Sequence, residues 1–218
     1  AAGLGPLALG TDVGGSVRVP SSFCGIFGLK PSFGLLPRYP GFFGEWETMV
    51  HVGPITRTVR DAALILDVMK GPDDRDRWSL PDSNINFLEE LNYAPGKTLK
   101  AGWSPTLGYV PVEPEVASLT KARVRLLADV GLDVDEINPG FENPHDDFST
   151  MIAIQTAGAL SKFLSTSRDQ FDPDLLKVIE KGVQISGVQY AQAEHRKFNL
   201  YGNMANFFKR FDVLITPT

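Results

Sequence analysis

The chain has 218 residues and a formal net charge of −5 at pH 7; 43% of its residues are hydrophobic and 22% are charged. This composition is typical of a globular protein that can bury a core, and the acidic balance predicts no nucleic acid as a direct partner. No apolar stretch approaches the roughly 18 residues of a membrane span, so no membrane is predicted as a partner either.

Cysteine and histidine usage narrows the class of protein further. The single cysteine, Cys24, excludes an intrachain disulfide and indicates a reducing compartment, which predicts a cytoplasmic location. We expect this residue to be a small buried apolar side chain. The three histidines lie far apart in the sequence, which gives no support for a metal site, and no cofactor is predicted.

The first third of the chain alternates short apolar runs with loops. Residues 1–6 read as the tail of a helix, because small residues and a glycine precede a proline. Residues 7–12 predict a short buried strand, and residues 31–53 predict a loop rich in glycine, proline and aromatic residues. The spacing of apolar residues over residues 56–71 predicts an amphipathic helix with Thr58 as its N-cap.

The middle of the chain predicts a strand–helix–strand unit. Residues 99–104 and 132–137 have the apolar character of strands, and residues 113–131 between them have that of a helix. Because such a crossover joins parallel strands, the sequence predicts a parallel sheet in this region.

The last third is predicted to be mainly helical, with helices near residues 147–165, 173–186 and 188–210 and a closing strand at residues 212–217. Aromatic and apolar residues recur on the last helix at steps of three and four, and we expect them to be core. These residues are Phe198, Tyr201, Met204, Phe208 and Phe211.

One serine, Ser16, follows two glycines directly after the predicted strand of residues 7–12. A serine hydroxyl acts as a nucleophile only when a base takes its proton and hydrogen-bond donors hold the oxyanion that forms. Glycines suit the second task, because substrate can approach their backbone and successive N–H groups can point at one site. Gly-Gly-Ser is also a common turn, so these three residues alone leave a purely structural interpretation open.

Competing motifs do not fit. Residues 3–8 match the loose dinucleotide pattern G-x-G-x-x-A, but Pro6 falls where the helix of such a site should begin. No Gly-Lys-Ser/Thr follows the glycines, so the segment is no phosphate-binding P-loop. Arg18 occupies the position that G-x-S-x-G would give to a glycine.

The segment from Leu7 to Gly34 carries a much more specific pattern. It reads Gly-Thr-Asp-x-Gly-Gly-Ser-Val-Arg-x-Pro over residues 10–20, followed by Cys-Gly, Gly-Leu-Lys-Pro and a final glycine. This segment resembles the hallmark of the amidase signature family. The resemblance continues in residues 52–76 and in the terminal Phe-Asp-Val-Leu-Ile-Thr-Pro-Thr, so that it spans the chain.

The resemblance implies an α/β fold with a mixed, mostly parallel central sheet and helices on both faces, incomplete in this chain. Residues 1–218 would form part of a single amidase signature domain. Residues 1–76 would be the signature core, and residues 77–218 the remainder with a helical region on the substrate side.

The resemblance also implies roles for individual residues. Ser16 matches the nucleophile that forms the acyl-enzyme, and the oxyanion hole would consist of the backbone amides of Val13, Gly14, Gly15 and Ser16. Three further residues would support the site, the last two as a charge pair that braces the loop: Thr11, Asp12 and Arg18. The residues that bind the substrate stay unassigned.

In the family, the base is a lysine that acts through a second serine in a cis peptide, and both precede the nucleophile. This chain begins without Met and after that region, so both ends read as cut from a longer protein. Lys30 is a tempting substitute, but it matches a family position whose role looks structural. We therefore expect the 218 residues alone to be inactive.

The predicted function is that of a serine amidohydrolase that cleaves linear carboxylic amides through an acyl-enzyme. Its partners would be a small-molecule amide and, as one option, a second copy in a homodimer. One alternative is the A subunit of a glutamine-dependent tRNA amidotransferase, but residues 39–54 lack the Ser and Leu-Asp elements usual there. The other alternative is a catalytically silent fragment that binds ligands or partners. An aromatic loop at residues 42–49 is a candidate lining of an acyl or aryl pocket or, equally, a surface loop.

Overall fold

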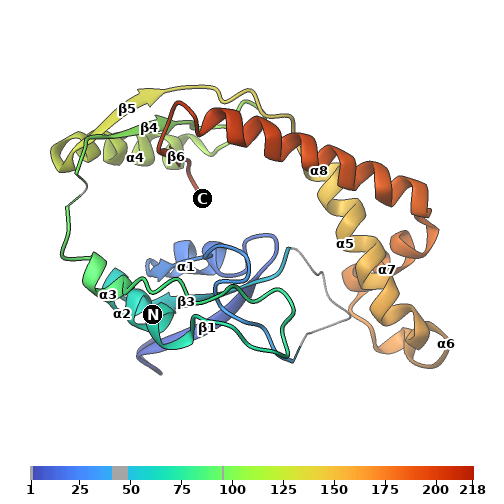
Figure 1. Cartoon of the computed structure of the whole chain (residues 1–218). Helices are drawn as coiled ribbons and strands as arrows, with labels where there is room; N and C mark the ends of the chain where they lie inside the picture. Colours follow the sequence, from blue (N-terminus) through green and yellow to red (C-terminus); the bar gives the residue numbers. More distant parts are fainter. Residues whose placement is uncertain (1, 41–48, 95) are drawn as a thin grey trace. The chain divides into compact units, whose positions relative to one another are not determined.

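The computed structural model describes residues 2–40, 49–94 and 96–218, and it divides into two compact units with the boundary between Ala94 and Pro95. Each unit builds its own three-stranded sheet. Figure 1 shows the helices and strands in the order of the chain. No helix in the described part of the chain is both long enough and apolar enough to cross a membrane.

The first unit contains an antiparallel sheet in the order β1-β3-β2. Its elements, in chain order, are β1 (Leu7–Asp12), α1 (Arg18–Cys24), β2 (Phe27–Gly28), β3 (His51–Thr56), α2 (Val59–Met69) and α3 (Phe87–Glu90). The strand predicted at residues 7–12 is confirmed, but only its last residue is buried. The start of β3 lies in the region expected to be loop; Pro54, which lacks an N–H, obscures that strand in the sequence.

Two local expectations for this unit are wrong. Residues 2–6 are not helical and instead lead directly into β1. Cys24 is exposed at the end of α1 rather than buried, and its thiol is free. Both expectations were based on residue types alone. Whether residues 2–6 form a helix and whether Cys24 is buried depend on what packs against them, which the local sequence does not show.

Helix α2 follows the prediction closely. The Asp61 N–H donates to the Thr58 side-chain oxygen at 3.1 Å, so that Thr58 caps the helix as its sequence position indicates. The buried face of α2 consists of Ala62, Ala63, Ile65 and Leu66. This face anchors the helix in the first unit, where it packs against β3.

The second unit contains a parallel sheet in the order β5-β4-β6. Its strands are β4 (Leu99–Trp103), β5 (Leu132–Glu136) and β6 (Val213–Ile215). Helix α4 (Pro114–Val124) and the 3₁₀ helix η1 (Arg125–Val130) connect β4 to β5, which confirms the predicted strand–helix–strand crossover.

The helices between β5 and β6 pack on one another (Figure 1). They are α5 (His145–Leu160), η2 (Ser161–Phe163), α6 (Leu164–Ser167), η3 (Arg168–Gln170), α7 (Pro173–Gln184) and α8 (Gly187–Phe207). Helix α5 contacts both α7 and α8, with Met151, Ala153 and Ile179 fully or almost fully buried.

The apolar stripe of α8 does not form a core in this structure. Phe198 and Tyr201 are 73% and 70% exposed, and Met204 and Phe208 are also exposed. Only Phe211, beyond the end of the helix, is buried, stacked on Phe207. The expectation that these residues are core is therefore wrong for all but Phe211, because periodicity shows which face is apolar and not what covers it.

The predicted α/β class with helices and a parallel sheet is confirmed. The described strands form two separate sheets: the sheet of the first unit is antiparallel, and that of the second unit is parallel.

Candidate functional site

The segment between β1 and α1 carries Ser16. Strand β1 ends at Asp12 and α1 begins at Arg18, and we call the five residues between them, 13–17, the serine loop. Within this loop Val17 is fully buried, whereas Ser16 is exposed. The buried Val17 side chain thus anchors the loop in the protein, whereas Ser16 stays accessible to a ligand.

The glycine before the serine is required by the backbone. Gly15 has φ of +113°, a conformation that residues with a side chain rarely adopt. A Cβ at this position would also lie 2.8 Å from a methyl group of Val19 on α1. Thr11, the residue of β1 before Asp12, is exposed and lies opposite Val52 of β3, and its supporting role stays a prediction.

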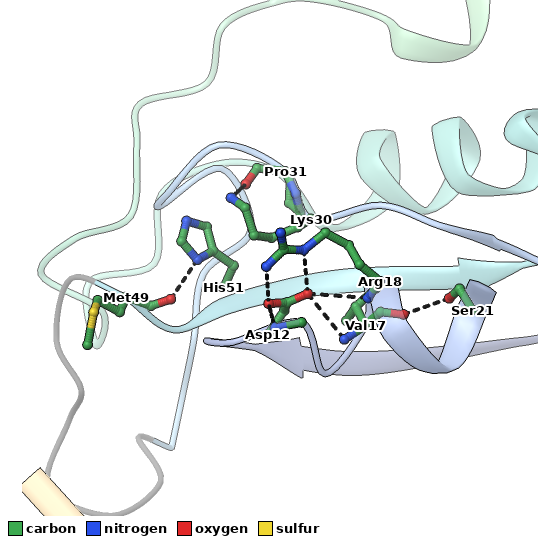
Figure 2. Close-up of polar contacts among 9 residues, drawn as sticks. Asp12, Val17, Arg18, Ser21, Lys30, Pro31, Met49 and His51 are labelled. Atoms are coloured by element: carbon green, nitrogen blue, oxygen red, sulfur yellow. Dashed lines mark hydrogen bonds and ion pairs between the residues drawn. The ribbon is translucent and has the colours of Figure 1, made fainter. Parts of the chain in front are cut away.

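The carboxylate of Asp12 organises the serine loop (Figure 2). This side chain is fully buried, and its two oxygens accept hydrogen bonds from the backbone amides of Gly15 at 2.8 Å, Val17 at 3.2 Å and Arg18 at 3.3 Å. The Arg18 guanidinium adds Nε at 2.9 Å and Nη2 at 2.8 Å. One buried anion therefore fixes both the curve of the loop and the start of α1.

These bonds decide the charge state of Asp12. Burial alone would raise its pKa, but the hydrogen bonds from Arg18 and Gly15 favour the ionised form and outweigh burial. The pKa of Asp12 is accordingly well below its usual range, and the pKa of Arg18 is raised by its bond to Asp12. Both members of the pair are therefore ionised at neutral pH.

The four amides expected to form the oxyanion hole are in different situations. The Gly15 N–H donates to Asp12, so in this structure it shapes the loop. No acceptor among the described residues takes the amides of Val13, Gly14 or Ser16. Three of the four predicted oxyanion donors thus have no hydrogen-bond acceptor in the described part of the chain, and their role stays a prediction.

Two further titratable side chains lie beside Asp12 (Figure 2): Lys30, which the sequence offered only as a substitute base, and His51, which it did not associate with the site. Lys30 follows β2 and donates from Nζ to the Pro31 carbonyl at 3.1 Å. His51 begins β3, directly opposite Asp12 in the antiparallel register, and its Nδ1 lies 2.8 Å from the Met49 carbonyl oxygen. The register of β1 and β3 is the signal that could have found His51.

The base that Ser16 needs stays unassigned in the described part of the chain. No side chain in the described ranges forms a hydrogen bond with the Ser16 hydroxyl, and no three His, Cys, Asp or Glu side chains there could jointly hold a metal ion. Lys30 bonds to a backbone carbonyl and not to the serine. Residues 42–48 of the aromatic loop lie outside the described residues, so its role as a pocket lining stays a prediction.

Comparisons with known proteins extend over the whole chain. The Amidase family model matches residues 1–218. An acylamidase from Rhodococcus erythropolis is 35% identical over 224 residues, which cover 100% of this chain and 46% of the acylamidase. The A subunit of a glutamyl-tRNA(Gln) amidotransferase from Sulfurihydrogenibium sp. is 30% identical over 243 residues and is covered to 50%.

The solved structures agree. The crystal structure of a bacterial aryl acylamidase of the amidase signature family superposes with a TM-score of 0.87 at 30% identity, covering 98% of this chain and 46% of that enzyme. The chain thus spans about half the length of the relatives it matches. With a family model over its full length and these relatives, the chain belongs to the Amidase family, that of the amidase signature enzymes.

Proposed function

We propose that the whole protein is a serine amidohydrolase that cleaves linear, non-peptide carboxylic amides through an acyl-enzyme on Ser16. The observation that carries this proposal is the serine loop itself: an exposed serine with free backbone amides around it, on a loop held by the buried Asp12 carboxylate and its partner Arg18. Relatives named acylamidase and aryl acylamidase support an amide as substrate.

The chemistry follows from the loop. The Ser16 oxygen attacks the amide carbonyl carbon, and the carbonyl oxygen becomes an oxyanion. The amides of Val13, Gly14 and Ser16 donate to that oxyanion, while Gly15 supplies the backbone turn. Collapse of the intermediate expels the amine, which takes up a proton, and leaves an ester on Ser16. Water then hydrolyses the ester to the carboxylic acid and restores the hydroxyl.

The proton of Ser16 needs a base. Family resemblance implies a lysine and a bridging serine that precede the nucleophile, outside these 218 residues. Burial lowers the pKa of Lys30, which favours a neutral amine, but its hydrogen bond to Pro31 does not direct it to the serine. We therefore expect no amide hydrolysis by the 218 residues alone.

The tRNA amidotransferase alternative has one observation in its favour, the relatives of that name. Against it stands the sequence after the signature, where the Ser and Leu-Asp elements of that branch are absent. Co-purification with a second subunit, together with glutaminase activity that depends on it, would support this alternative. A catalytically silent protein would show neither activity nor labelling of Ser16.

The proposed location of the enzyme is the cytoplasm, and its proposed assembly is a homodimer. The free, exposed thiol of Cys24 supports a reducing compartment. Fractionation of the source cells and sedimentation of the whole protein test these two statements.

The decisive experiment is labelling of the whole protein with a fluorophosphonate probe, read by mass spectrometry, together with turnover of an aryl acylamide. We expect labelling on Ser16, and loss of both labelling and turnover in Ser16→Ala. Ser22→Ala is the matched control, because Ser22 is a nearby exposed serine on α1. Labelling that persists in Ser16→Ala would refute the assignment.

A further inference from the structure

His51 and Asp12 form a cross-strand pair. They lie directly opposite each other in the antiparallel pairing of β1 and β3, which places their Cβ atoms about 5 Å apart on one face of the sheet. Asp12 is the residue that shapes the serine loop. Whatever charge His51 carries therefore acts at close range on the anion that holds Ser16 in place.

The imidazole of His51 is fixed in position and in tautomer. Its ring lies edge-on to Phe33, with centroids 5.5 Å apart and an interplanar angle of 76°. Nδ1 lies 2.8 Å from the Met49 carbonyl oxygen, which can only accept, so Nδ1 carries the hydrogen. In the neutral ring, Nε2 is then the nitrogen without a proton, and any proton gained at low pH goes there.

Among the residues that the structure describes, one negative and two positive groups gather near His51. Asp12 on β1 is the negative group, and Arg18 on α1 and Lys30 after β2 are the positive groups. Arg18 occupies both oxygens of Asp12. Lys30 has only the Pro31 carbonyl as a hydrogen-bond partner in the described part of the chain. Figure 2 shows these side chains gathered around Asp12.

The direction of each pKa agrees with this arrangement. Burial, followed by the charge of Lys30, lowers the pKa of His51 below its ordinary value of 6.5. Burial, followed by the charge of Arg18, lowers the pKa of Lys30. Burial and Lys30 thus favour the neutral form of His51, and they outweigh the backbone hydrogen bonds with Met49 and Asp12 and the charge of Asp12, which raise its pKa.

We propose that His51 is a positioning residue for the serine loop and that it fulfils this role only as a neutral imidazole. A proton taken from solvent onto Nε2 places a third cation beside Lys30 and Arg18. Its attraction for the Asp12 carboxylate competes with the hydrogen bonds from Gly15, Val17 and Arg18 that shape the loop. It also repels Arg18, which holds that carboxylate through two further bonds. This inference rests on the proposed role of Ser16 as nucleophile.

The test compares two titrations of the whole protein. One is the rate at which a fluorophosphonate probe labels Ser16, measured from pH 4.5 to 8.5; the other is the NMR titration of the His51 ring. We expect a limb of the labelling rate that falls about tenfold per pH unit below its midpoint, as for the loss of one neutral imidazole. This midpoint should coincide with that of His51, below 6.5.

Lys30→Met gives the sharpest prediction, because it removes a repelling cation and keeps an apolar stem of similar length. The NMR titration midpoint of His51 should move to higher pH. The acidic limb of the pH profile of the labelling rate should move to higher pH by the same amount. Lys177→Met, which removes an exposed lysine on α7, should move neither.

His51→Asn keeps a donor near the position of Nδ1 and cannot gain a proton. We expect it to abolish the limb that follows the His51 midpoint, while His195→Gln, at an exposed histidine of α8, leaves that limb in place. Circular dichroism confirms folding, and His51→Gln serves as a second neutral variant if His51→Asn unfolds.

Two results would overturn the inference. In the first, Lys30→Met shifts the NMR midpoint of His51 but not the acidic limb of the labelling rate. In the second, that limb is unchanged in both His51→Asn and His51→Gln. These failures leave Ser16 labelled and the proposed function intact. Labelling at a residue other than Ser16 would instead refute the proposed function, and the NMR titration would not be affected by it.

Discussion

Arg18 binds the Asp12 carboxylate through two nitrogens: Nη2 lies 2.8 Å from Oδ1, and Nε lies 2.9 Å from Oδ2. The arginine side chain is 49% exposed, whereas the carboxylate is fully buried. The arginine thus reaches from solvent to an anion beneath the serine loop. Such bidentate pairs add geometric definition to their electrostatic energy. The pair therefore determines the shape of the loop as well as its charge.

Asp12→Asn should destabilise the protein by about 3 kcal/mol or more near neutral pH, because it leaves Arg18 and several amides with a weaker acceptor in a buried position. The lowered pKa of Asp12 gives the sign with pH. Its stabilising effect is present above its ordinary value of 3.8 and is lost as the pH falls below that value. Urea unfolding between pH 3 and 7 should show the gap between the wild type and Asp12→Asn closing toward acid.

The control is Asp73→Asn. Asp73 pairs with Arg75 through the same two guanidinium nitrogens, at 2.9 Å and 2.7 Å, but this pair lies at the surface. We expect little change in the free energy of unfolding and no loss of Ser16 labelling. An equal effect of the two substitutions would show that burial of Asp12 does not matter.

Local signals in the sequence predicted local structure well. The cap at Thr58 depends on neighbours within one helical turn, and it is present. The apolar spacing that predicts α2 is local too, and Ala62, Ala63 and Leu66 are buried on that helix. The crossover from β4 to β5 likewise follows from periodicity alone. Where a feature depends on a distant partner, as with the burial of Cys24 or the stripe around Tyr201, the sequence shows an apolar face but not what covers it.

The site was predictable to the same extent. The motif located Ser16, the glycines and the Asp12–Arg18 pair, since all of them lie within seven residues and the pair is present. It did not show that the Gly15 amide serves Asp12, because this depends on how the loop curves. Nor did the motif place His51 beside Asp12. The two residues are far apart in the sequence, and only the pairing register of β1 and β3 brings them together.

Gly182→Ala should destabilise the second unit by about 2–3 kcal/mol or more. Gly182 lies on α7 where it crosses α5, and a Cβ there would overlap the carbonyl oxygen of Ala153 and crowd the methyl group of Ala157. Backbone cannot move aside as a flexible side chain can, so the two helices must separate. A lower midpoint in urea unfolding, monitored by circular dichroism, checks this prediction.

The matched control for that substitution is Gly158→Ala, on the partner helix α5. A Cβ at Gly158 meets no atom within 4 Å. In the interior of a helix, alanine is preferred over glycine by roughly 0.5–1 kcal/mol, so this variant should be slightly more stable than the wild type. If both substitutions were destabilising to a similar degree, close approach of the helices would not be the cause.

Thr58→Ala should lower the free energy of unfolding by about 1 kcal/mol, and Thr58→Ser should change it by much less. The Thr58 oxygen accepts from the Asp61 N–H, one of the amides at the start of α2 that has no partner within the helix, and serine keeps that oxygen. Urea unfolding of the three proteins at one pH measures the difference. Because Thr58 lies outside the serine loop, the rate of Ser16 labelling should be the same in all three proteins under conditions in which they are folded. Equal destabilisation by alanine and serine would mean that the methyl group of Thr58, and not its hydroxyl, stabilises this end of α2.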